Sequence, residues 1–324
     1  MHAVLIGAGS ISEYHLKAST AIPGFRIVAI ADTRMDRANE LASQYELSAY
    51  TDYKLMIEQL RPELAIVALP HFLHRDAAVF CANHGCHLLL EKPMAISTQD
   101  CLTIMEAVER NKVSLLVGQT QQYIAQNLAA KSIIRLGELG KLVMIHEKRH
   151  GPYFTEQRPA WFLDKSMSGG GIVFNLGNHS IDKIQWLTDT RIQRVRASLS
   201  YYADSYPDIE GSAALLLETS AGVPCTVSLN GYESVRGEET ELIFTHGMMK
   251  IVNHQSVSIA LSDRYEEYPV ANTGNPFELQ LLDLLGCIRE GRQPYASGEY
   301  ALSVVRVVEA VYESADKGEE ICIK

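Results

Sequence analysis

The sequence predicts an α/β protein of two domains, a doubly wound parallel sheet followed by an α+β domain rich in antiparallel strands. Two observations lead to this fold class. Short apolar runs alternate with helical patterns through the first 120 residues, whereas between residues 193 and 268 strand patterns follow one another without a helix. A chain of 324 residues is long enough for two hydrophobic cores.

The N-terminal region contains apolar runs that are typical of buried strands. Amphipathic stretches such as Met35–Gln44 and Ser97–Arg110 lie between these runs and predict helices. Strands without polar alternation are buried on both faces, as in a parallel sheet that helices cover on both sides. The expected strands are 3–7, 26–32, 64–70, 87–93 and 113–118.

The pattern changes after residue 120. Turn signals at Ser220-Ala221-Gly222 and His246-Gly247 separate the later strands, which favours antiparallel pairing. No low-complexity linker is present, so we expect a dinucleotide-binding domain over 1–120 joined tightly to a second domain over 121–324. In that second domain we expect helices over 125–136, 276–289 and 298–316, and strands over 141–150 and through 193–268.

Composition excludes several classes of function. A hydrophobic content of 47% is ordinary for a soluble globular protein, and a net charge of −10 without a basic block argues against a nucleic-acid partner. No apolar run approaches the length of about 18 residues that a membrane span needs. The first residues lack the basic region of a signal peptide. Six cysteines show no metal-ligand spacing, so we expect reduced thiols, no metal site and a cytoplasmic protein.

A glycine-rich turn follows the first predicted strand and opens a helix. In Gly7-Ala8-Gly9-Ser10-Ile11-Ser12, Gly7 is expected to make the tight turn and Gly9 to let the backbone approach a pyrophosphate. The helix N-terminus adds N–H donors and the positive end of a dipole. Ser12 stands where Gly or Ala is usual, at a position that needs a small side chain. An α/β domain without a nucleotide is the alternative.

An acidic residue ends the second predicted strand. Asp32 is placed to accept hydrogen bonds from both hydroxyls of the adenosine ribose and to repel a 2′-phosphate. Thr33 and Arg34 follow Asp32, and the positive charge of Arg34 weakens the preference for NAD over NADP. The sequence therefore predicts NAD rather than NADP as the cofactor.

The third and fourth strands end in polar triplets. Ligands of open parallel sheets bind at the carboxyl ends of the strands, so Leu69-Pro70-His71 and Glu91-Lys92-Pro93 belong on the cofactor side. For Lys92, a solvated lysine beside a turn-forming proline is the alternative.

A second glycine run, Gly169-Gly170-Gly171, precedes a helical pattern that carries Asn175, His179 and Asp182. Because the first loop fits a phosphate better, we expect this run to be the close-packed start of a helix. In a regular helix, offsets of four and seven residues bring the three polar side chains to one face within about 40° of arc. A hydrogen-bonded core histidine is the alternative for His179.

Together these residues resemble the Gfo/Idh/MocA family of NAD(P)-dependent oxidoreductases, which act mainly on sugars and cyclitols. The resemblance covers nearly the whole chain. It rests on the first glycine loop with His15 downstream, on Pro70 followed by His74, on GCHLLLEKP, which ends in Glu91-Lys92-Pro93, and on the second glycine run with its polar residues.

The resemblance implies a Rossmann domain and then an α+β domain with a large, open, mostly antiparallel sheet, whose exposed face makes a homodimer or homotetramer interface. It also implies that Lys92 hydrogen-bonds the reacting oxygen. The family motif D-x-x-x-H-x-x-D stands here as Asn175, His179 and Asp182. The residues expected to contact the cofactor are Gly7, Gly9, Ser10, Ile11, Asp32, Thr33, Arg34, Leu69, Pro70, His71, His74, Glu91, Lys92 and Pro93.

The chemistry of alcohol oxidation suits these groups. A neutral His179 can take the hydroxyl proton, and a protonated Lys92 can stabilise the developing alkoxide, although Lys92 could exchange the proton instead. The departure at Asn175 removes a negative charge beside the imidazole. Either Asp182 orients the ring, or the substrate differs from the polyols of the Asp-bearing members.

The aromatic-rich loop over 150–170 is the expected source of substrate contacts. Arg158 and Lys165 could bind an anionic group and Trp161 could stack on a sugar; a loop packed on the core with solvated charges is the alternative. Gln119, Gln121 and Tyr123 fall where the family lines the nicotinamide side of the site. Gln122 falls near a position where many members carry arginine.

The leading hypothesis is an NAD-dependent dehydrogenase or reductase that acts on a secondary alcohol or carbonyl of a sugar, sugar derivative or cyclitol. An NAD-dependent glycoside hydrolase, which removes and returns a hydride, is the alternative within enzymes. A ligand-sensing protein that keeps the cofactor fold without the chemistry is the third hypothesis, which the presence of Lys92 and His179 disfavours.

Overall fold

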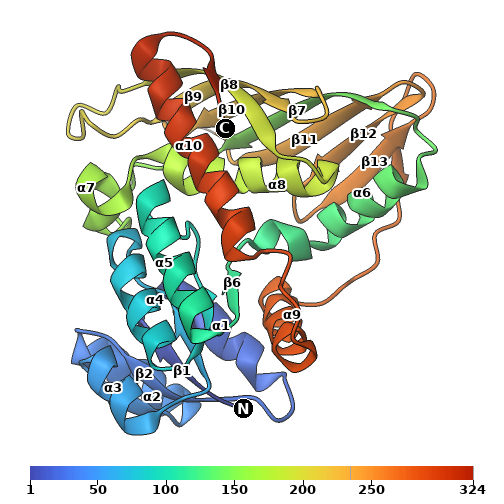
Figure 1. Cartoon of the computed structure of the whole chain (residues 1–324). Coiled ribbons are helices and arrows are strands. Elements are labelled where there is room, and N and C mark those ends of the chain that lie inside the picture. The colour runs from blue at the N-terminus through green and yellow to red at the C-terminus, as the bar shows by residue number, and fades with distance from the viewer. Residues whose placement is uncertain (234, 324) are drawn as a thin grey trace. The chain divides into compact units, whose positions relative to one another are not determined.

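A computed structural model describes residues 1–233 and 235–323 of the chain. The chain forms two compact units (Figure 1). Unit 1 comprises Met1–Thr120 and Gly274–Leu302, and unit 2 comprises Gln121–Thr273 and Ser303–Lys324. Each unit is built on its own sheet.

Unit 1 contains a six-stranded parallel sheet in the order β3-β2-β1-β4-β5-β6, which is the Rossmann order. The predicted parallel α/β sheet is confirmed. Strand β3 was not predicted, because its one exposed and two half-buried residues form no apolar run. The strands are β1 (His2–Ile6), β2 (Arg26–Ala31), β3 (Ser48–Tyr50), β4 (Leu64–Val67), β5 (His87–Leu90) and β6 (Leu115–Val117).

Helices connect these strands, and side-chain caps start two of them. Asp52 accepts a hydrogen bond from the Lys54 N–H at 2.8 Å, and Ser97 accepts one from the Asp100 N–H at 3.1 Å. The helices are α1 (Ser10–Thr20), α2 (Met35–Tyr45), α3 (Tyr53–Leu60), η1 (His71–Leu73), α4 (His74–Asn83) and α5 (Thr98–Asn111). The N-cap of α1 is Gly9, which has no side chain to cap the helix.

Helix α9 (Pro276–Glu290) belongs to unit 1, whereas the sequence analysis expected all of 121–324 to form the second domain. The reason is hydrophobic packing. Leu281 and Leu284 are buried in the same core as the strands of the Rossmann sheet. The ring of Phe277 lies 5.2 Å from that of Tyr14. The periodicity of the sequence predicts such a helix, but not the sheet that it covers.

Unit 2 contains a nine-stranded sheet in the order β14-β13-β12-β11-β7-β10-β9-β8-β15. Every pair of neighbours is antiparallel except β7 and β10, so the predicted mostly antiparallel sheet is confirmed. The strands are β7 (Leu142–His150), β8 (Ile192–Ser200), β9 (Ser212–Thr219), β10 (Pro224–Asn230), β11 (Gly237–Phe244), β12 (Gly247–Val252), β13 (Ser256–Ala260), β14 (Glu266–Tyr268) and β15 (Ile321–Cys322).

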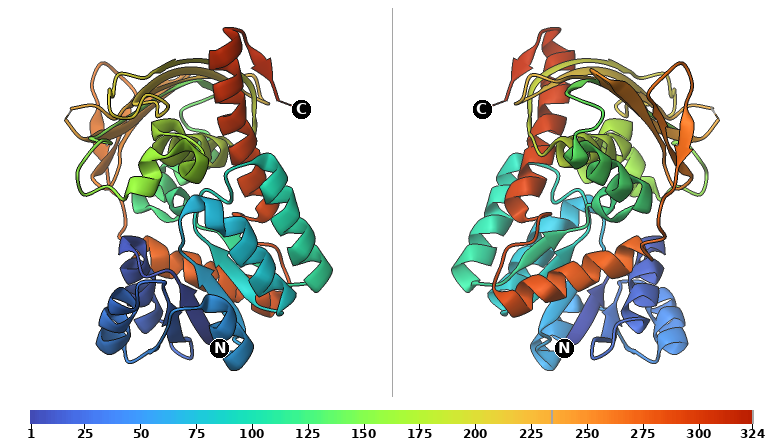
Figure 2. Two further views of the ribbon diagram at one scale, coloured as in Figure 1. Left: turned by 90° about the vertical axis from the view of Figure 1, so that its left-hand side faces the viewer. Right: turned by 90° about the vertical axis from the view of Figure 1, so that its right-hand side faces the viewer.

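Two helices, α6 (Ala125–Leu136) and α8 (Asn178–Thr188), cover one face of this sheet (Figure 2). The C-terminus of α8 is held by Lys131 of α6, whose ammonium group contacts the Trp186 carbonyl oxygen and lies 2.6 Å from the Asp189 carboxylate. The remaining helical segments are η2 (Thr120–Tyr123), η3 (Ala160–Leu163), α7 (Lys165–Ser168), a π-helical turn η4 (Val173–Gly177) and α10 (Gly298–Lys317).

Two further observations concern the whole described chain. Within residues 1–233 and 235–323, none of the helices is both long enough and apolar enough to cross a bilayer. None of the six cysteines, all of which lie in the described residues, forms a disulfide, and five of them are buried.

The placement of α9 yields a stability prediction. Leu284 is fully buried, whereas Leu282 in the same helix is 43% exposed. Leu284→Ala should therefore lower the free energy of unfolding by about 2–5 kcal/mol, and Leu282→Ala should change it by less than about 0.5 kcal/mol. Thermal and urea unfolding measure both. Equal losses from the two substitutions would contradict the packing of α9 on the core of unit 1.

Candidate active site

The two glycines of the first loop have different structural roles. Gly7 has a φ of +102°, and a Cβ there would lie 2.2 Å from the carbonyl oxygen of Ala68. A Cβ at Gly9 would meet no protein atom within 4 Å. The fold itself thus requires Gly7, whereas Gly9 leaves open space at the N-terminus of α1. These features fit a dinucleotide pyrophosphate, which binds helix N–H groups at close range.

Ser12 and Asp32 fix the loop. The buried Ser12 hydroxyl donates to the Gly7 carbonyl oxygen at 2.8 Å, which explains why a serine fits at the third position. Asp32 follows β2 and accepts hydrogen bonds from the Ala8 N–H at 2.8 Å and the Arg34 N–H at 2.9 Å. A carboxylate has about four lone-pair sites, so two remain for the hydroxyls of a ribose.

Glu91 faces the interior of unit 1. Its carboxylate lies 2.7 Å from Nε2 of the buried His15 and accepts the Lys92 N–H at 3.2 Å. A Cβ at Gly118 would come within 3.2 Å of the same carboxylate, so the absence of a side chain there makes room for it. Glu91 therefore anchors the end of β5 to α1.

His74 ties the ends of two strands together. It is fully buried, with Nδ1 2.9 Å from the Pro93 carbonyl oxygen and Nε2 2.8 Å from that of Leu69. Burial lowers the pKa of His74, and the contacts with the two carbonyl oxygens oppose that shift. Lys92 is thus held on one side by the Glu91–His15 pair and on the other by His74.

The second glycine run is a close-packed helix start, as predicted. A Cβ at Gly170 would lie 1.9 Å from the Tyr312 hydroxyl oxygen, and one at Gly171 would lie 2.3 Å from the Glu210 carbonyl oxygen. The buried Glu210 carboxylate accepts hydrogen bonds from the Gly171 N–H at 2.9 Å, the Val173 N–H at 3.0 Å and the Tyr312 hydroxyl at 2.7 Å. Burial raises the pKa of Glu210, and these hydrogen bonds oppose the shift.

The helix that follows is not regular, and this corrects one expectation. Asn175 lies in the π-helical turn η4, so the angle estimated for a continuous α-helix does not apply to it. His179 and Asp182 lie in α8, three residues apart on neighbouring turns. Single π-helical turns are frequent at functional sites, where they redirect one side chain relative to the next turn.

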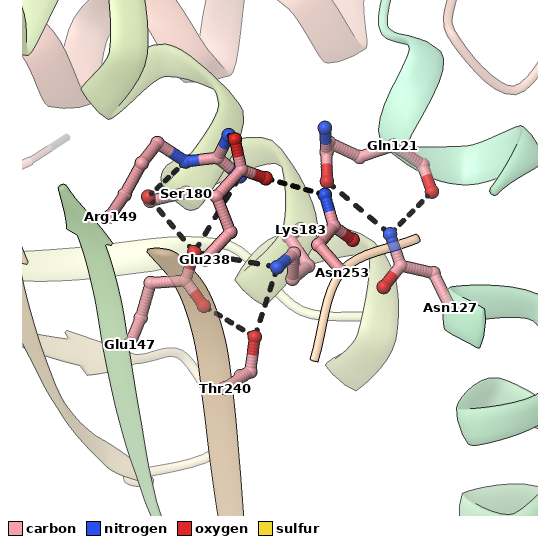
Figure 3. A network of polar contacts seen from close by, with 9 residues as sticks. All are labelled: Gln121, Asn127, Glu147, Arg149, Ser180, Lys183, Glu238, Thr240 and Asn253. Atoms are coloured by element: carbon pink, nitrogen blue, oxygen red, sulfur yellow. Dashed lines mark hydrogen bonds and ion pairs between the residues drawn. The ribbon is translucent and has the colours of Figure 1, made fainter. Parts of the chain in front are cut away.

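Beneath α8 lies a buried charged cluster that the sequence analysis missed (Figure 3). Glu147 of β7 accepts a hydrogen bond from the Ser180 hydroxyl at 3.1 Å and lies 3.5 Å from the Lys183 ammonium. Lys183 also donates to the Thr240 hydroxyl at 3.0 Å. Burial lowers the pKa of Lys183, and the charge of Glu147 opposes that shift. Because Ser180 and Lys183 flank Asp182, the cluster fixes the helix that carries His179.

Charged residues at inward positions of β7 were the available sequence signal for this cluster. Glu147 and Arg149 alternate with exposed residues and are almost fully buried. Arg149 lies 2.7 Å from Glu238 of β11. In a strand, such an alternation of buried charges indicates a polar network rather than a solvent face.

Three glutamines follow β6. Gln122 donates to the buried Asp182 carboxylate at 3.2 Å, so a neutral amide holds this acid. The backbone carbonyl of Gln121 accepts a hydrogen bond from Asn127 at 2.8 Å. Gln119 is fully buried, and its amide atoms have no hydrogen-bond partner among the described residues. Tyr123 ends η2 and is partly buried.

The loop over 150–170 packs its aromatic residues against one another. Tyr153 is fully buried, and the guanidinium of Arg158 lies 3.9 Å from its ring centroid. Trp161 stacks on Phe162 with ring centroids 3.7 Å apart, so one face of the indole is covered. The Lys165 ammonium lies 5.7 Å from the Tyr312 ring centroid.

The glycine loop allows a paired prediction. Gly7→Ala should lower the free energy of unfolding by about 1–3 kcal/mol, because a Cβ meets backbone and the φ angle is unfavourable. Gly9→Ala should keep the fold but weaken the thermal stabilisation that NAD produces. Unfolding midpoints with and without NAD measure both. Unchanged stabilisation of the Gly9→Ala protein would contradict a pyrophosphate contact at Gly9.

Comparisons with known proteins agree with this arrangement. The family model "Oxidoreductase family, NAD-binding Rossmann fold" of GFO/IDH/MocA matches residues 1–119, and the GFO/IDH/MocA C-terminal domain matches residues 127–250. A 1-carboxy-3-chloro-3,4-dihydroxycyclohexa-1,5-diene dehydrogenase of Comamonas testosteroni is 27% identical over 66% of this chain and 54% of the relative. The chain thus spans about half the length of that relative.

Two other proteins are similar to this chain, one by sequence and one by structure. Inositol 2-dehydrogenase of Salmonella typhimurium is 25% identical over 71% of this chain and 67% of the relative. An aldose-aldose oxidoreductase from Caulobacter crescentus, solved with glycerol, superposes with a TM-score of 0.92 at 22% identity, covering 100% of this chain and 99% of that chain. With family models matching both units, the chain belongs to the Gfo/Idh/MocA family of oxidoreductases, and its Rossmann domain binds NAD.

Proposed function

We propose that this protein transfers a hydride between NAD and a secondary alcohol or carbonyl of a sugar, sugar derivative or cyclitol. The observation that carries the proposal is the setting of Lys92. It follows β5 of an NAD-binding Rossmann unit and is held by the Glu91–His15 pair and by the contact of His74 with Pro93. NAD, when bound, supplies the acceptor or donor of the hydride.

The predicted cofactor residues divide into those that would contact the dinucleotide and those that position Lys92. Gly7, Gly9, Ser10 and Ile11 would offer backbone to the pyrophosphate, and Asp32 with Thr33 and Arg34 would contact the adenosine ribose. Leu69, Pro70 and His71 lie beyond the carboxyl end of β4, where they would contact the dinucleotide. Glu91, His74 and Pro93 contact other parts of unit 1 in the structure, so we assign them the role of positioning Lys92.

The proton chemistry is assigned to Lys92 and His179. A protonated Lys92 would stabilise negative charge on the reacting oxygen, and a neutral imidazole of His179 would take the hydroxyl proton. Asp182 would orient the imidazole, and the hydrogen bond from Gln122 would keep its carboxylate in place. Asn175, Gln119, Tyr123 and Trp161 are proposed to contact the substrate.

The names of the relatives support the proposed substrate class. Their names include an inositol dehydrogenase, a dihydroxycyclohexadiene dehydrogenase and an aldose oxidoreductase, all of which act on rings or chains with several hydroxyl groups. A polyhydroxylated substrate with a secondary alcohol suits a site that contains an amide, an imidazole and an ammonium group.

We also propose a homodimer or homotetramer formed through the sheet of unit 2. Leu216 of β9 is 52% exposed and Val143 of β7 is 45% exposed. Leu216 borders a hollow on the sheet surface that Tyr201, Ala214 and Val227 also line. Apolar side chains on an open sheet face are typical of an interface between subunits.

The activity is tested with a panel of sugars and inositols, by NADH formation. Lys92→Ala should lower turnover at least about 100-fold, because a group that stabilises the transition state is lost. Its stabilisation by NAD should remain, and the exposed Lys17→Ala serves as the matched control. Sugar release without net NADH would indicate a hydrolase instead. Stabilisation by NAD without any turnover would favour a sensing role.

Asp32 leads to a prediction about cofactor choice. Its carboxylate would repel the 2′-phosphate of NADP, so NAD should raise the unfolding midpoint more than an equal concentration of NADP does. Differential scanning fluorimetry over a range of concentrations measures the two apparent affinities. Equal shifts would show that Asp32 does not discriminate.

Asn175 leads to a prediction about pH. An aspartate there would favour the charged imidazolium of His179, so Asn175→Asp should move the rise of kcat/KM in alcohol oxidation to higher pH, by roughly 1 unit. Asn175→Ser adds no charge and should leave the profile in place. Identical profiles for the wild type and Asn175→Asp would exclude electrostatic coupling between positions 175 and 179.

A further inference from the structure

Arg158 is a partly buried cation without an acidic partner. Burial is the largest influence on its guanidinium and lowers its pKa. In residues 1–233 and 235–323, no carboxylate comes within ion-pair distance of it. Charged groups that lose water normally gain a counter-charge from the protein or from a ligand. The arrangement of Arg158 therefore needs an explanation.

The guanidinium is held in a fixed orientation by contacts that consume little of its hydrogen-bonding capacity. Nε donates to the Tyr153 carbonyl oxygen. The central carbon of the guanidinium, Cζ, lies over the rings of Tyr153 and Phe162, 3.9 and 5.1 Å from their centroids. An arginine has five N–H donors. Only Nε–H has a hydrogen-bond acceptor among the described residues, so the donors on Nη1 and Nη2 remain for a ligand.

The surroundings of Arg158 connect it to the candidate active-site residues of unit 2. Burial raises the pKa of the Tyr153 hydroxyl, whereas the charge of Arg158 and the side chain of Asn175 lower it. The side chain of Asn175 thus influences the tyrosine over which the Arg158 guanidinium lies. Asn175 is separated from His179 by one helical turn.

The local charge favours an anion. The charge of Arg236 lowers the pKa of Arg158 further, so Arg236 adds to the positive potential at Arg158. Glu210 also acts on Tyr153, but its carboxylate is engaged by the Gly171 and Val173 N–H groups and by the Tyr312 hydroxyl. The charge of Glu210 is thus already supplied with hydrogen-bond donors.

We propose that Arg158 binds a carboxylate or phosphate group of the substrate through Nη1 and Nη2, with Arg236 adding positive potential. The enzyme would then act on an acidic sugar, a sugar phosphate or an acidic cyclitol rather than on a neutral polyol. This inference rests on the proposed oxidoreductase function and narrows its substrate class. Planar pairing of a guanidinium with an oxyanion gives both affinity and orientation.

Matched ligands test the inference. D-Glucuronate and D-glucose 6-phosphate are each compared with D-glucose, which lacks the anionic group. For the NAD-loaded protein we measure the apparent affinity by thermal shift and NADH formation with each compound. The wild type should bind at least one anion about 10- to 100-fold more tightly than glucose, the range expected for hydrogen bonds to a charged group. The two arms distinguish a carboxylate from a phosphate.

Variants separate binding from packing. Arg158→Met keeps an apolar side chain on the Tyr153 ring, and should bring the anion-to-glucose affinity ratio close to one while leaving glucose binding unchanged. Arg158→Lys should retain part of the anion-to-glucose affinity ratio. Arg236→Met should lower that ratio about 2- to 3-fold. The exposed Arg264→Met is the matched control and should keep it. Unfolding midpoints without ligand show whether each variant is folded.

The outcomes distinguish this inference from the proposed function. A wild type that binds glucose as tightly as both anions, or an Arg158→Met protein that keeps the ratio, would overturn the anion site. NADH formation from glucose without any preference for anions would overturn only this inference. A preference for anions that depends on Arg158 would support the site, even if no compound of the panel yields NADH.

Discussion

A buried carboxylate has to be supplied with hydrogen-bond donors, and three such groups determine where the candidate functional residues lie. Glu91 takes the Lys92 N–H and the His15 ring, Glu147 takes Ser180 and Lys183, and Glu210 takes the N–H groups of the second glycine run. Each acid anchors the segment that carries Lys92, His179 or Asn175. Leaving a buried polar group without its hydrogen-bond partner costs about 1–3 kcal/mol, and more for a charged group, so these segments have few alternative positions.

This arrangement separates the anchoring residues from the candidate catalytic residues. In the triplet that ends β5, Glu91 turns toward the core of unit 1, whereas Lys92 is only partly buried. In α8, Ser180 and Lys183 reach Glu147 and the sheet, while His179 keeps part of its surface exposed. Neighbouring residues therefore carry different tasks, because successive side chains of a strand end or a helix point in different directions.

The polar residues around His179 are largely neutral. Asn175 replaces a possible carboxylate, and the acid that remains, Asp182, is held by the neutral Gln122 amide. Positive charge is concentrated instead at Arg158 and Arg236, which lack carboxylate partners in the described part of the chain. Such a distribution favours an electrostatic contact with the substrate over one within the protein.

The sequence by itself determined the parallel sheet, the mostly antiparallel second sheet and the turn at Gly7, because these depend on local periodicity and on backbone sterics. It also identified the start of the helix at Gly169–Gly171. Only the tertiary structure decided that α9 packs on the Rossmann sheet, that Asn175 lies in a π-helical turn, and that Trp161 stacks on Phe162. The pairing of Glu147 with Lys183 likewise needed the tertiary structure, because the alternating charges of β7 do not identify their partners on other elements. The packing of α9 and the buried cluster depend on contacts between residues far apart in the chain, the π-helical turn depends on a shifted hydrogen bond, and the stack of the adjacent Trp161 and Phe162 depends on side-chain conformation. None of these leaves a period in the sequence.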